Sequence, residues 1–416
     1  MTIAPWPAPQ LPVLVGEGPA LALHSERDGA ARILQVDGTA TMYVCGITPY
    51  DATHLGHAAT YVTFDLANRV LRDGGHPVRY VQNVTDIDDP LLERAARDGV
   101  DWRELATSEI ALFHDDMSAL RVLPPDHYVS VVQSMDRHVA VINDLVAKGV
   151  TYTVETPDAV DGADVYLDLS TQTSFGSVSG WDRGQMFEVF SDRGGDPDRA
   201  GKRDALDPLL WRAEREGEPA WDGGPIGRGR PGWHVECTTI ALDHLGMGFD
   251  LQAGGTDLIF PHHEMSAVQA VALTDTTPFA HAYAHQAMVA YDGEKMSKSK
   301  GNLVRVSQLR RAGVDPMVIR LVLLDQHYRS PWEYTDQLLT DAEKRWHTWQ
   351  SALTTGGDEG ADELVTTIRQ ALADDLDSPT AVGAVDAWAA TAPQAGSPAV
   401  MVREALDALL GLAAHD

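Results

Sequence analysis

Cysteine is nearly absent from this sequence. Only Cys45 and Cys237 occur among its 416 residues. Two thiols cannot build a disulfide framework, and a chain of this length buries enough apolar surface to fold without one. Taken by themselves, the two cysteines are most simply interpreted as buried, unreactive thiols.

Basic residues are also scarce. The chain has 32 Lys and Arg residues against 61 Asp and Glu residues, which gives a formal net charge of -29. Such a charge repels polyanions, whereas nucleic-acid-binding proteins usually present a basic face. We therefore expect small-molecule substrates and no nucleic acid among the partners, although the commonest meaning of a high net charge is solubility.

Long hydrophobic runs are missing as well. No apolar stretch approaches the roughly 20 residues that span a bilayer. Residues 1–14 are rich in proline and lack the basic segment with which a secretion signal begins. These absences predict a cytoplasmic protein with no membrane partner.

The residues that follow predict a parallel sheet. Residues 42–47 form a short apolar run suited to a buried strand, residues 58–72 carry apolar side chains at helical spacing, and residues 78–84 are typical of a second strand. A strand, a helix and a strand within about 40 residues make a βαβ unit, whose strands are parallel. We therefore expect an α/β fold.

The remaining chain predicts a second region and a helical end. Residues 101–149 are mostly helical in pattern, and residues 155–230 look like a loop-rich insertion that ends in a flexible run at 227–232. Strand-like runs return at 249–253 and 284–290. Helical patterns fill 303–416, with linkers near 355–363 and 391–398.

The domain boundaries follow from these patterns. We predict an N-terminal arm at 1–38, two halves of a catalytic domain at 39–125 and 231–305, a connective insertion at 126–230, and a C-terminal helical bundle at 306–416.

The first motif with chemical meaning is His54-Leu55-Gly56-His57, between the first strand and the helix. A helix start offers free backbone N–H groups, and two histidines three residues apart lie on one face of the first turn. Gly56 would let a nucleotide approach closely. The motif suits ATP phosphates and the charge that develops at the α-phosphorus. A pair of surface histidines is an equally good interpretation of this motif alone.

The second motif is Lys295-Met296-Ser297-Lys298-Ser299. Lysines in a flexible loop can close over a triphosphate and neutralise departing pyrophosphate, although such a run by itself is more often a solvated loop. The order and context of the two motifs strengthen each other. Together they resemble the signature pair of class I aminoacyl-tRNA synthetases.

Further segments narrow the resemblance to the cysteinyl-tRNA synthetases and, more closely, to their relatives, the ATP-dependent cysteine:glucosaminyl-inositol ligases of mycothiol biosynthesis. The resemblance covers roughly residues 40 to 330. It implies a Rossmann-like nucleotide-binding domain of the class I type, interrupted by a connective insertion and followed by a helical domain. The segments that carry it are 43–48, 83–89, 232–237 and 260–264.

The resemblance also implies a zinc site that sequence spacing alone does not suggest. Cys45, Cys237 and His262 correspond to the zinc ligands of the family, although the two cysteines are 192 residues apart. Three protein ligands leave one position of a Zn²⁺ tetrahedron open. The thiolate of substrate cysteine can fill it, whereas the harder hydroxyl of serine competes poorly.

One position departs from the synthetase pattern. Cysteinyl-tRNA synthetases carry a glutamate four residues after the ligand histidine as a further zinc ligand, and this chain has Ser266 there. The change fits a three-ligand site like that of the ligases. Water or Glu264 as fourth ligand is the alternative.

Other site residues transfer from the family by motif. His54, His57, Lys295 and Lys298 are implied to be catalytic, with Mg²⁺ accompanying ATP. The residues implied to line the ATP and cysteinyl-adenylate site are Cys45, Gly46, Ile47, Thr48, Thr60, Asn83, Val84, Thr85, Trp233, Gly255, Thr256, Asp257 and Val289. Among these, Asp257 suits the ribose hydroxyls and Val289 is placed to meet the adenine.

Two acidic segments allow more than one interpretation. A magnesium role is conceivable for Asp86, Asp88 and Asp89, but we favour a structural turn after a strand. Residues 192–197 match a family stretch and are interpreted either as a contact for the second substrate or as a rigid turn.

The predicted function is ATP-dependent ligation of cysteine to the amine of glucosaminyl-inositol through a cysteinyl-adenylate, by a monomer. Only 117 residues follow Ser299, which is short for a region that holds a tRNA. Cysteinyl-tRNA synthetase is the alternative enzyme. A silent paralogue that binds a nucleotide or a partner protein is the alternative without catalysis, against which the intact motifs argue.

Overall fold

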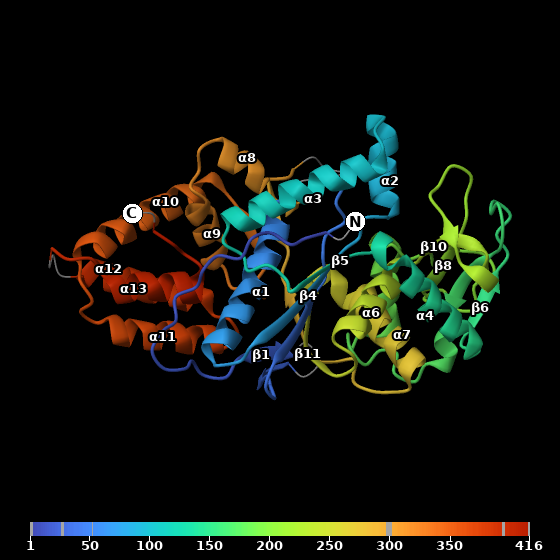
Figure 1. Ribbon diagram of the computed structural model, residues 1–416, viewed down its shortest axis with the longest axis horizontal. Coiled ribbons are helices and arrows are strands. Elements are labelled where there is room, and N and C mark those ends of the chain that lie inside the picture. The colour runs from blue at the N-terminus through green and yellow to red at the C-terminus, as the bar shows by residue number, and fades with distance from the viewer. Residues whose placement is uncertain (1–2, 26–28, 52, 297–301, 393–395, 415–416) are drawn as a thin grey trace.

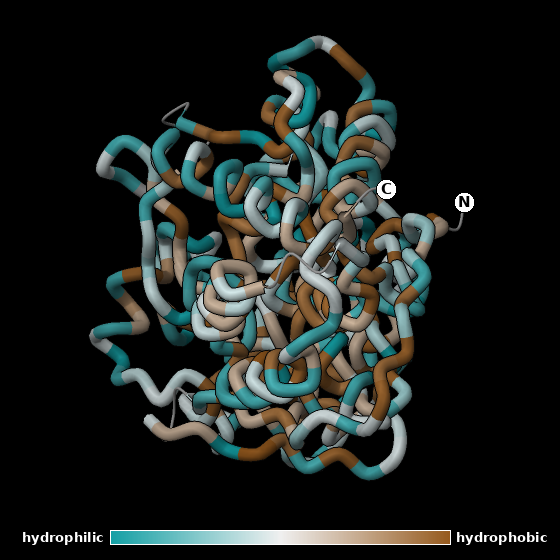
Figure 2. The backbone as a smooth tube through the Cα atoms, turned by 90° about the vertical axis from the view of Figure 1, so that its left-hand side faces the viewer, coloured by the Kyte–Doolittle hydropathy of each residue, from teal (hydrophilic) through white to brown (hydrophobic). Residues whose placement is uncertain are grey.

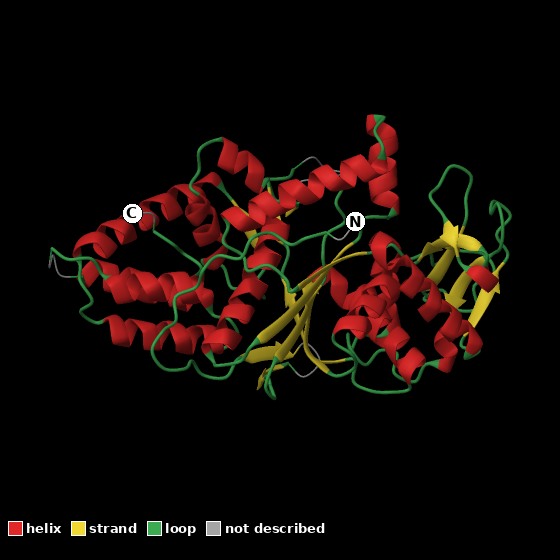
Figure 3. Cartoon of the chain, in the orientation of Figure 1, coloured by secondary structure: helices red, strands yellow, loops and turns green. Residues whose placement is uncertain are grey.

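The structure is a computed structural model that describes residues 3–25, 29–51, 53–296, 302–392 and 396–414 (Figure 1). A central sheet lies between the C-terminal helices on one side and a second α/β region, formed by the middle of the chain, on the other (Figures 1 and 3). The strands are β1 (Ala22–Ser25), β2 (Ala30–Ile33), β3 (Ala40–Val44), β4 (Val78–Val84), β5 (His127–Ser130), β6 (Thr151–Val154), β7 (Asp164–Leu167), β8 (Leu209–Ala213), β9 (Trp221–Asp222), β10 (Arg228–Pro231), β11 (Phe249–Gly255), β12 (Ala280–Gln286), β13 (Val289–Tyr291), β14 (Glu294–Lys295) and β15 (Trp332–Tyr334). The α-helices are α1 (Leu55–Asp73), α2 (Asp89–Asp98), α3 (Trp102–Ala119), α4 (Met135–Ala147), α5 (Arg183–Phe190), α6 (Trp233–His244), α7 (Glu264–Thr274), α8 (Val306–Arg311), α9 (Pro316–Leu324), α10 (Asp336–Thr355), α11 (Ala361–Ala373), α12 (Ser378–Thr391) and α13 (Val400–Ala405).

The central sheet is parallel, with strand order β12-β11-β3-β4-β5. The predicted βαβ unit is confirmed as β3, α1 and β4. The sheet continues into β5, so the boundary expected at residue 125 falls before its last strand. Parallel strands end at the same edge of a sheet, and ligands of such folds bind there. The carboxyl edge of this sheet is therefore the expected location of the functional site.

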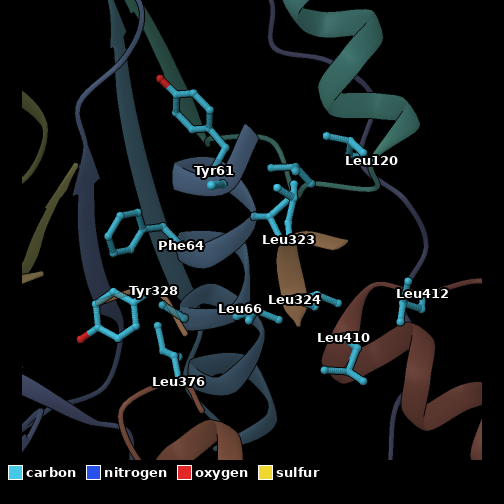
Figure 4. Close-up of a cluster of buried hydrophobic side chains, with 14 of the residues drawn as sticks. Tyr61, Phe64, Leu66, Leu120, Leu323, Leu324, Tyr328, Leu376, Leu410 and Leu412 are labelled. Atoms are coloured by element: carbon cyan, nitrogen blue, oxygen red, sulfur yellow. The ribbon is translucent and has the colours of Figure 1, made fainter. Parts of the chain in front are cut away.

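Helix α1 joins the sheet to the C-terminal helices. Its buried side chains include Tyr61, Phe64 and Leu66. In Figure 4, Leu66 lies on the side of α1 that faces leucines of α9 and of the last segment of the chain, such as Leu323 and Leu410, whereas Tyr61 and Phe64 point to the other side of the helix. The predicted helical end of the chain is confirmed as α8 to α13, and the expected linkers lie at the α10–α11 and α12–α13 connections.

The insertion is more ordered than its composition predicts. Instead of loops, residues 155–230 contribute β7, β8, β9, β10 and α5, and with β6 these strands form a five-stranded antiparallel sheet. The run expected to be flexible contains β10. A Cβ on Gly229 would lie 2.2 Å from the carbonyl oxygen of Arg212 and 2.6 Å from Nε1 of Trp211, so this glycine permits close packing rather than mobility.

The N-terminal arm is also packed rather than loose. It contains the antiparallel pair β1–β2. Trp6 is 2% exposed and donates from Nε1 to the carbonyl oxygen of Val122 at 2.8 Å. Viewed from the end formed by the C-terminal helices, hydrophobic residues gather toward the centre and hydrophilic residues follow the outer turns (Figure 2). Within the described part of the chain, no helix has the length and apolar character needed to cross a bilayer.

Candidate active site and metal centre

Three side chains that are far apart in the sequence converge at the carboxyl edge of the sheet. Cys45 follows β3, Cys237 lies in α6, and His262 lies in the π-helical turn η6 (Ile259–His263) after β11. One ligand atom from each lies within 4.8 Å of the others, and all three residues are buried. Among the described residues, no other group of this kind is found. These distances confirm the predicted convergence of the three side chains. It arises because β3 and β11 are neighbours in the sheet and because α6 and η6 flank β11 in the chain.

The backbone around Cys45 is held closely. Its N–H donates to the carbonyl oxygen of Ala253 at 3.0 Å, and the hydroxyl of Tyr61 donates to its carbonyl oxygen at 3.2 Å. The N–H of Gly46 donates to Oδ1 of Asn83 at 2.7 Å. A Cβ on Gly46 would lie 1.7 Å from the carbonyl oxygen of Asn83, so no other residue fits here without moving the strand ends apart.

Replacing Gly46 with alanine is therefore expected to displace Cys45 and to lower the free energy of unfolding by about 1–3 kcal/mol. Bound metal, measured by elemental analysis of the purified variant, should fall with it. The matched control is Gly383→Ala, because Gly383 lies within α12 with open space around it and alanine favours a helix by about 0.5–1 kcal/mol. A Gly46→Ala protein with unchanged stability and metal content would contradict this account.

A chain of histidines supports the cysteine. Nε2 of His263 lies 3.3 Å from Sγ of Cys45, and Nδ1 of His263 lies 2.8 Å from Nε2 of His285. Burial lowers the pKa of His263, and it lowers the pKa of His285 to about 3, so both rings are neutral. As a metal-bound thiolate, Cys45 would only accept hydrogen bonds, which would place the proton of His263 on Nε2 and that of His285 on its own Nε2. The chain thereby orients the sulfur.

Sequence reasoning missed these supporting histidines. His234 is a further one, with Nδ1 at 3.0 Å from Nδ1 of His262, and burial lowers its pKa as well. The available signal was the doublet His262-His263, of which only the first residue was assigned a role.

The fourth ligand position has no side chain assigned to it. The carboxylate of Glu264, the alternative considered from the sequence, accepts from the backbone N–H groups of Gly176, Val178 and Ser179 and from the hydroxyl of Ser179. It therefore anchors the insertion and is not a ligand. Ser266 directs its hydroxyl to the carbonyl oxygen of His234 at 3.4 Å. The described donor set is two thiols and one imidazole.

The first nucleotide motif is arranged differently from the expectation. Nδ1 of His54 accepts from the N–H groups of Gly56 at 3.1 Å and His57 at 3.4 Å, so these N–H groups of the helix start are not free for a phosphate. The His54 and His57 rings stack with centroids 3.8 Å apart. A Cβ on Gly56 would lie 2.9 Å from the His54 ring, which explains the glycine.

The second nucleotide motif lies partly outside the described residues. Lys295 pairs through its backbone with Ala290 in the sheet β14-β13-β15, and Met296 is buried. Nothing is described of the Lys295 side chain, and Lys298 lies outside the described residues. Val289 is buried at the start of β13.

The other predicted residues lie at the ends of the central strands, in α1 and in the turn after β11. Asn83 donates to the hydroxyl of Thr85 at 3.1 Å, and Thr85 in turn lies 3.4 Å from Glu236. The Thr60 hydroxyl donates to the carbonyl oxygen of Gly56 at 3.2 Å, within α1. Ile47 and Val84 are buried. Gly255 ends β11, and Thr256 and Asp257 lie in the following turn η5 (Thr256–Leu258).

The acidic segments behave mainly as structural turns. Asp86 accepts from the hydroxyl of Ser130 and, at 3.0 Å, from the N–H of Val132. Asp88 caps the start of α2 by accepting from the N–H of Asp89 at 2.8 Å. In the stretch 192–197, Arg193 donates to the carbonyl oxygens of Asp257 at 3.1 Å and Phe260 at 2.7 Å, which joins the insertion to the site.

A cavity of about 1020 Å³ lies beside the metal ligands and is lined by Thr48, Trp233, His234 and Asp257 among others. The Trp233 ring is 4.5 Å from the His262 ring. A second cavity of about 1120 Å³ follows the outer edge of β12. Because Trp233 and His234 in its lining contact His262, the first cavity is the better candidate for the reaction.

The sequence is similar to a known family and to named proteins along most of its length. Residues 33–344 match the family described as tRNA synthetases class I (C) catalytic domain. A Geodermatophilus obscurus protein named L-cysteine:1D-myo-inositol 2-amino-2-deoxy-alpha-D-glucopyranoside ligase is 57% identical, over 98% of each chain. A protein of the same name from Streptomyces coelicolor is 56% identical, over 98% of this chain and 99% of its own.

Solved structures resemble the fold. Mycobacterium tuberculosis methionyl-tRNA synthetase with methionyl-adenylate superposes with a TM-score of 0.61 at 17% identity, over 88% of this chain and 82% of that one. The ternary complex of a LeuRS from Agrobacterium radiobacter gives a TM-score of 0.62 at 11% identity, over 91% and 84% of the two chains. The predicted α/β architecture of the class I type is confirmed.

Proposed function

This chain belongs to the family of class I (C) tRNA synthetase catalytic domains, and we propose that it ligates L-cysteine to the amine of glucosaminyl-inositol with ATP, a step of mycothiol biosynthesis. Cysteine is first joined to AMP with release of pyrophosphate. The amine then takes the cysteinyl group, and AMP leaves. The observation that carries this proposal is the 57% identity, along the whole chain, to a protein named as that ligase.

The choice of cysteine is supported by the metal centre. Two thiols and an imidazole within 4.8 Å are the donor set that Zn²⁺ prefers, which makes Cys45, Cys237 and His262 the residues that would hold it. Zinc would supply a position that binds the substrate thiol as thiolate and lowers its pKa. Burial raises the pKa of Cys45, so the positive charge of a metal is what favours its ligand form. His263 and His285 keep Cys45 oriented.

The activation step is assigned to residues around the nucleotide. His54 and His57 present stacked rings at the start of α1 and are proposed to stabilise charge at the α-phosphorus. Lys295 and Lys298 are proposed to neutralise pyrophosphate. Mg²⁺ would accompany the ATP phosphates. The residues proposed to bind the adenylate are those of the sequence prediction: Cys45, Gly46, Ile47, Thr48, Thr60, Asn83, Val84, Thr85, Trp233, Gly255, Thr256, Asp257 and Val289.

Cysteinyl-tRNA synthetase is the second candidate, because it shares the first half-reaction. The comparisons favour the ligase, since relatives with that name cover 98% of this chain. The net charge of -29 also opposes binding of a polyanion.

The test gives purified protein Mg-ATP and cysteine, with either glucosaminyl-inositol or cysteine tRNA. We expect cysteine-dependent exchange of labelled pyrophosphate into ATP, and formation of the cysteinyl amide and AMP with the sugar alone. Efficient charging of tRNA would instead support the synthetase. Absence of exchange with either acceptor would point to a nucleotide-binding protein without catalysis.

A further inference from the structure

The cavity of about 1020 Å³ has a wall that cysteine activation does not use. It lies where the strand ends meet the insertion, and besides Trp233 it is lined by Asp88 and Asp89 after β4 and by Arg212 and Arg230 from the inserted sheet. Ligand cavities are commonly about 300–1,000 Å³. This one therefore has room for a second substrate next to the metal ligands.

Arg230 has an unsatisfied donor at this wall. The residue is 5% exposed, and its Nη2 forms an ion pair with Asp89 and lies 3.5 Å from Glu218. Its Nε is buried and has no hydrogen-bond partner. A buried donor without an acceptor is costly, and more so on a charged group. Because Arg230 lines the cavity, its guanidinium group is placed to donate to an oxygen of a bound molecule.

Asp88 supplies the complementary group. Its Oδ1 caps α2, and the carboxylate lines the cavity. The titratable groups that interact with it are Arg230, Asp89, Glu93, Glu236 and Tyr50. Burial raises the pKa of Asp88 to about 6, so it is ionised at neutral pH and is a stronger base than an ordinary aspartate.

We propose, on the basis of the ligase function above, that this cavity holds the amino-sugar acceptor, with the guanidinium group of Arg230 donating to one of its oxygens and Asp88 accepting the proton of its amine. A polyhydroxylated acceptor suits paired donors and acceptors, and the Trp233 ring provides an apolar face for the sugar. The Trp233 ring is 4.5 Å from the His262 ring, so the cavity borders one of the residues that would hold the metal.

The transfer balances with these groups alone. The lone pair of the amine forms a bond to the acyl carbon of the cysteinyl-adenylate, and the bond from that carbon to the phosphate oxygen breaks. AMP leaves with the electron pair. The proton lost from nitrogen passes to Asp88 and from there to water.

The experiment separates the two half-reactions in Asp88→Asn and Arg230→Gln proteins. Asparagine caps a helix as well as aspartate does, so α2 is preserved. Cysteine-dependent pyrophosphate exchange is expected to stay within about 2-fold of the parent protein, which also reports correct folding. Arg230→Gln should raise the KM for glucosaminyl-inositol by about 10- to 100-fold, as expected for a lost hydrogen bond to a charged group. Asp88→Asn should lower the ligation kcat by about 100- to 10,000-fold.

Two matched variants sharpen the result. Arg228→Gln alters the same strand at an arginine that is half-exposed and paired with Glu214, and it should leave the KM for the acceptor unchanged. Arg230→Lys keeps the charge beside Asp89 but removes the planar guanidinium group, and it should raise that KM by less than Arg230→Gln does. In the parent protein, acceptor-dependent turnover should rise through about pH 6 as Asp88 ionises, and this limb should vanish in Asp88→Asn.

An acceptor KM and a ligation kcat that both match the parent protein would overturn the assignment of this cavity while leaving the ligase function intact. A parent protein that exchanges pyrophosphate but forms no amide would overturn the ligase function itself, and the acceptor cavity with it.

Discussion

Replacing Cys237 with serine is expected to remove bound zinc and cysteine activation together. Cys237 is 1% exposed, and its sulfur is one of three ligand atoms that lie within 4.8 Å of one another. With one thiol lost, two side chains remain, and the hydroxyl of serine is a poor zinc ligand. Loss of an outer-shell partner alone reduces metal affinity or activity by about 10- to 100-fold, so loss of a ligand should exceed that range.

Zinc per chain and cysteine-dependent pyrophosphate exchange measure this prediction. Ser266→Ala is the control, because Ser266 lies in α7 near the site and contacts His234 but is not a member of the ligand group. It should keep both zinc and exchange. A Cys237→Ser protein that still selects cysteine over serine would rule out metal-based selection of the substrate.

Replacing Asp65 with asparagine is expected to destabilise the protein by about 3–5 kcal/mol. Asp65 in α1 accepts from Arg69 at 2.7 Å and from the N–H of Leu123 at 2.8 Å, and it also pairs with Arg320 of α9. All three charged side chains are fully buried. Asparagine leaves two buried guanidinium groups without a negative charge, which is the costly outcome for a buried pair.

The two arginines make this cluster the junction between α1 and the end of the chain. Arg69 donates to the carbonyl oxygen of Asp407 at 2.6 Å, and Arg320 donates to that of Leu410 at 2.6 Å. Urea denaturation measures the loss of stability. Arg137→Gln is the control, because its partner Asp243 lies on the surface and exposed pairs contribute about 0–1 kcal/mol. Equal effects of the two substitutions would contradict the account.

The same cluster predicts that the protein loses folding stability at low pH. Burial raises the pKa of Asp65, but attraction to Arg69 and Arg320 outweighs it, so the pKa lies below its ordinary value of about 3.9. A lowered folded-state pKa means that the contribution is complete above about pH 4 and is lost as pH falls through the folded-state pKa. The stability difference between the parent protein and Asp65→Asn should therefore shrink in acid.

Much of the fold was readable in local pattern. The apolar run before Cys45, the helix that contains Leu66 and the strand at 78–84 follow periodicity, which short-range packing enforces. The prediction of a loop-rich insertion was wrong, because the glycines and aspartates on which it rested are typical of loops but here lie in and between strands. Gly229 instead lets a strand pass over Trp211, a contact between residues 18 positions apart that composition does not record.

The features of the site also divide into those that the sequence determined and those that the tertiary structure determined. The sequence motifs determined the family. Through the family they also determined the three candidate metal ligands, Cys45, Cys237 and His262. Only the tertiary structure decided that Glu264 anchors the insertion, that His263 and His285 orient Cys45, and that Arg230 faces a cavity beside Trp233. The reason is physical. Periodicity reports which face of an element is buried, whereas hydrogen bonds and unsatisfied donors depend on which elements meet, and that is decided when the strands of the sheet and the insertion come together.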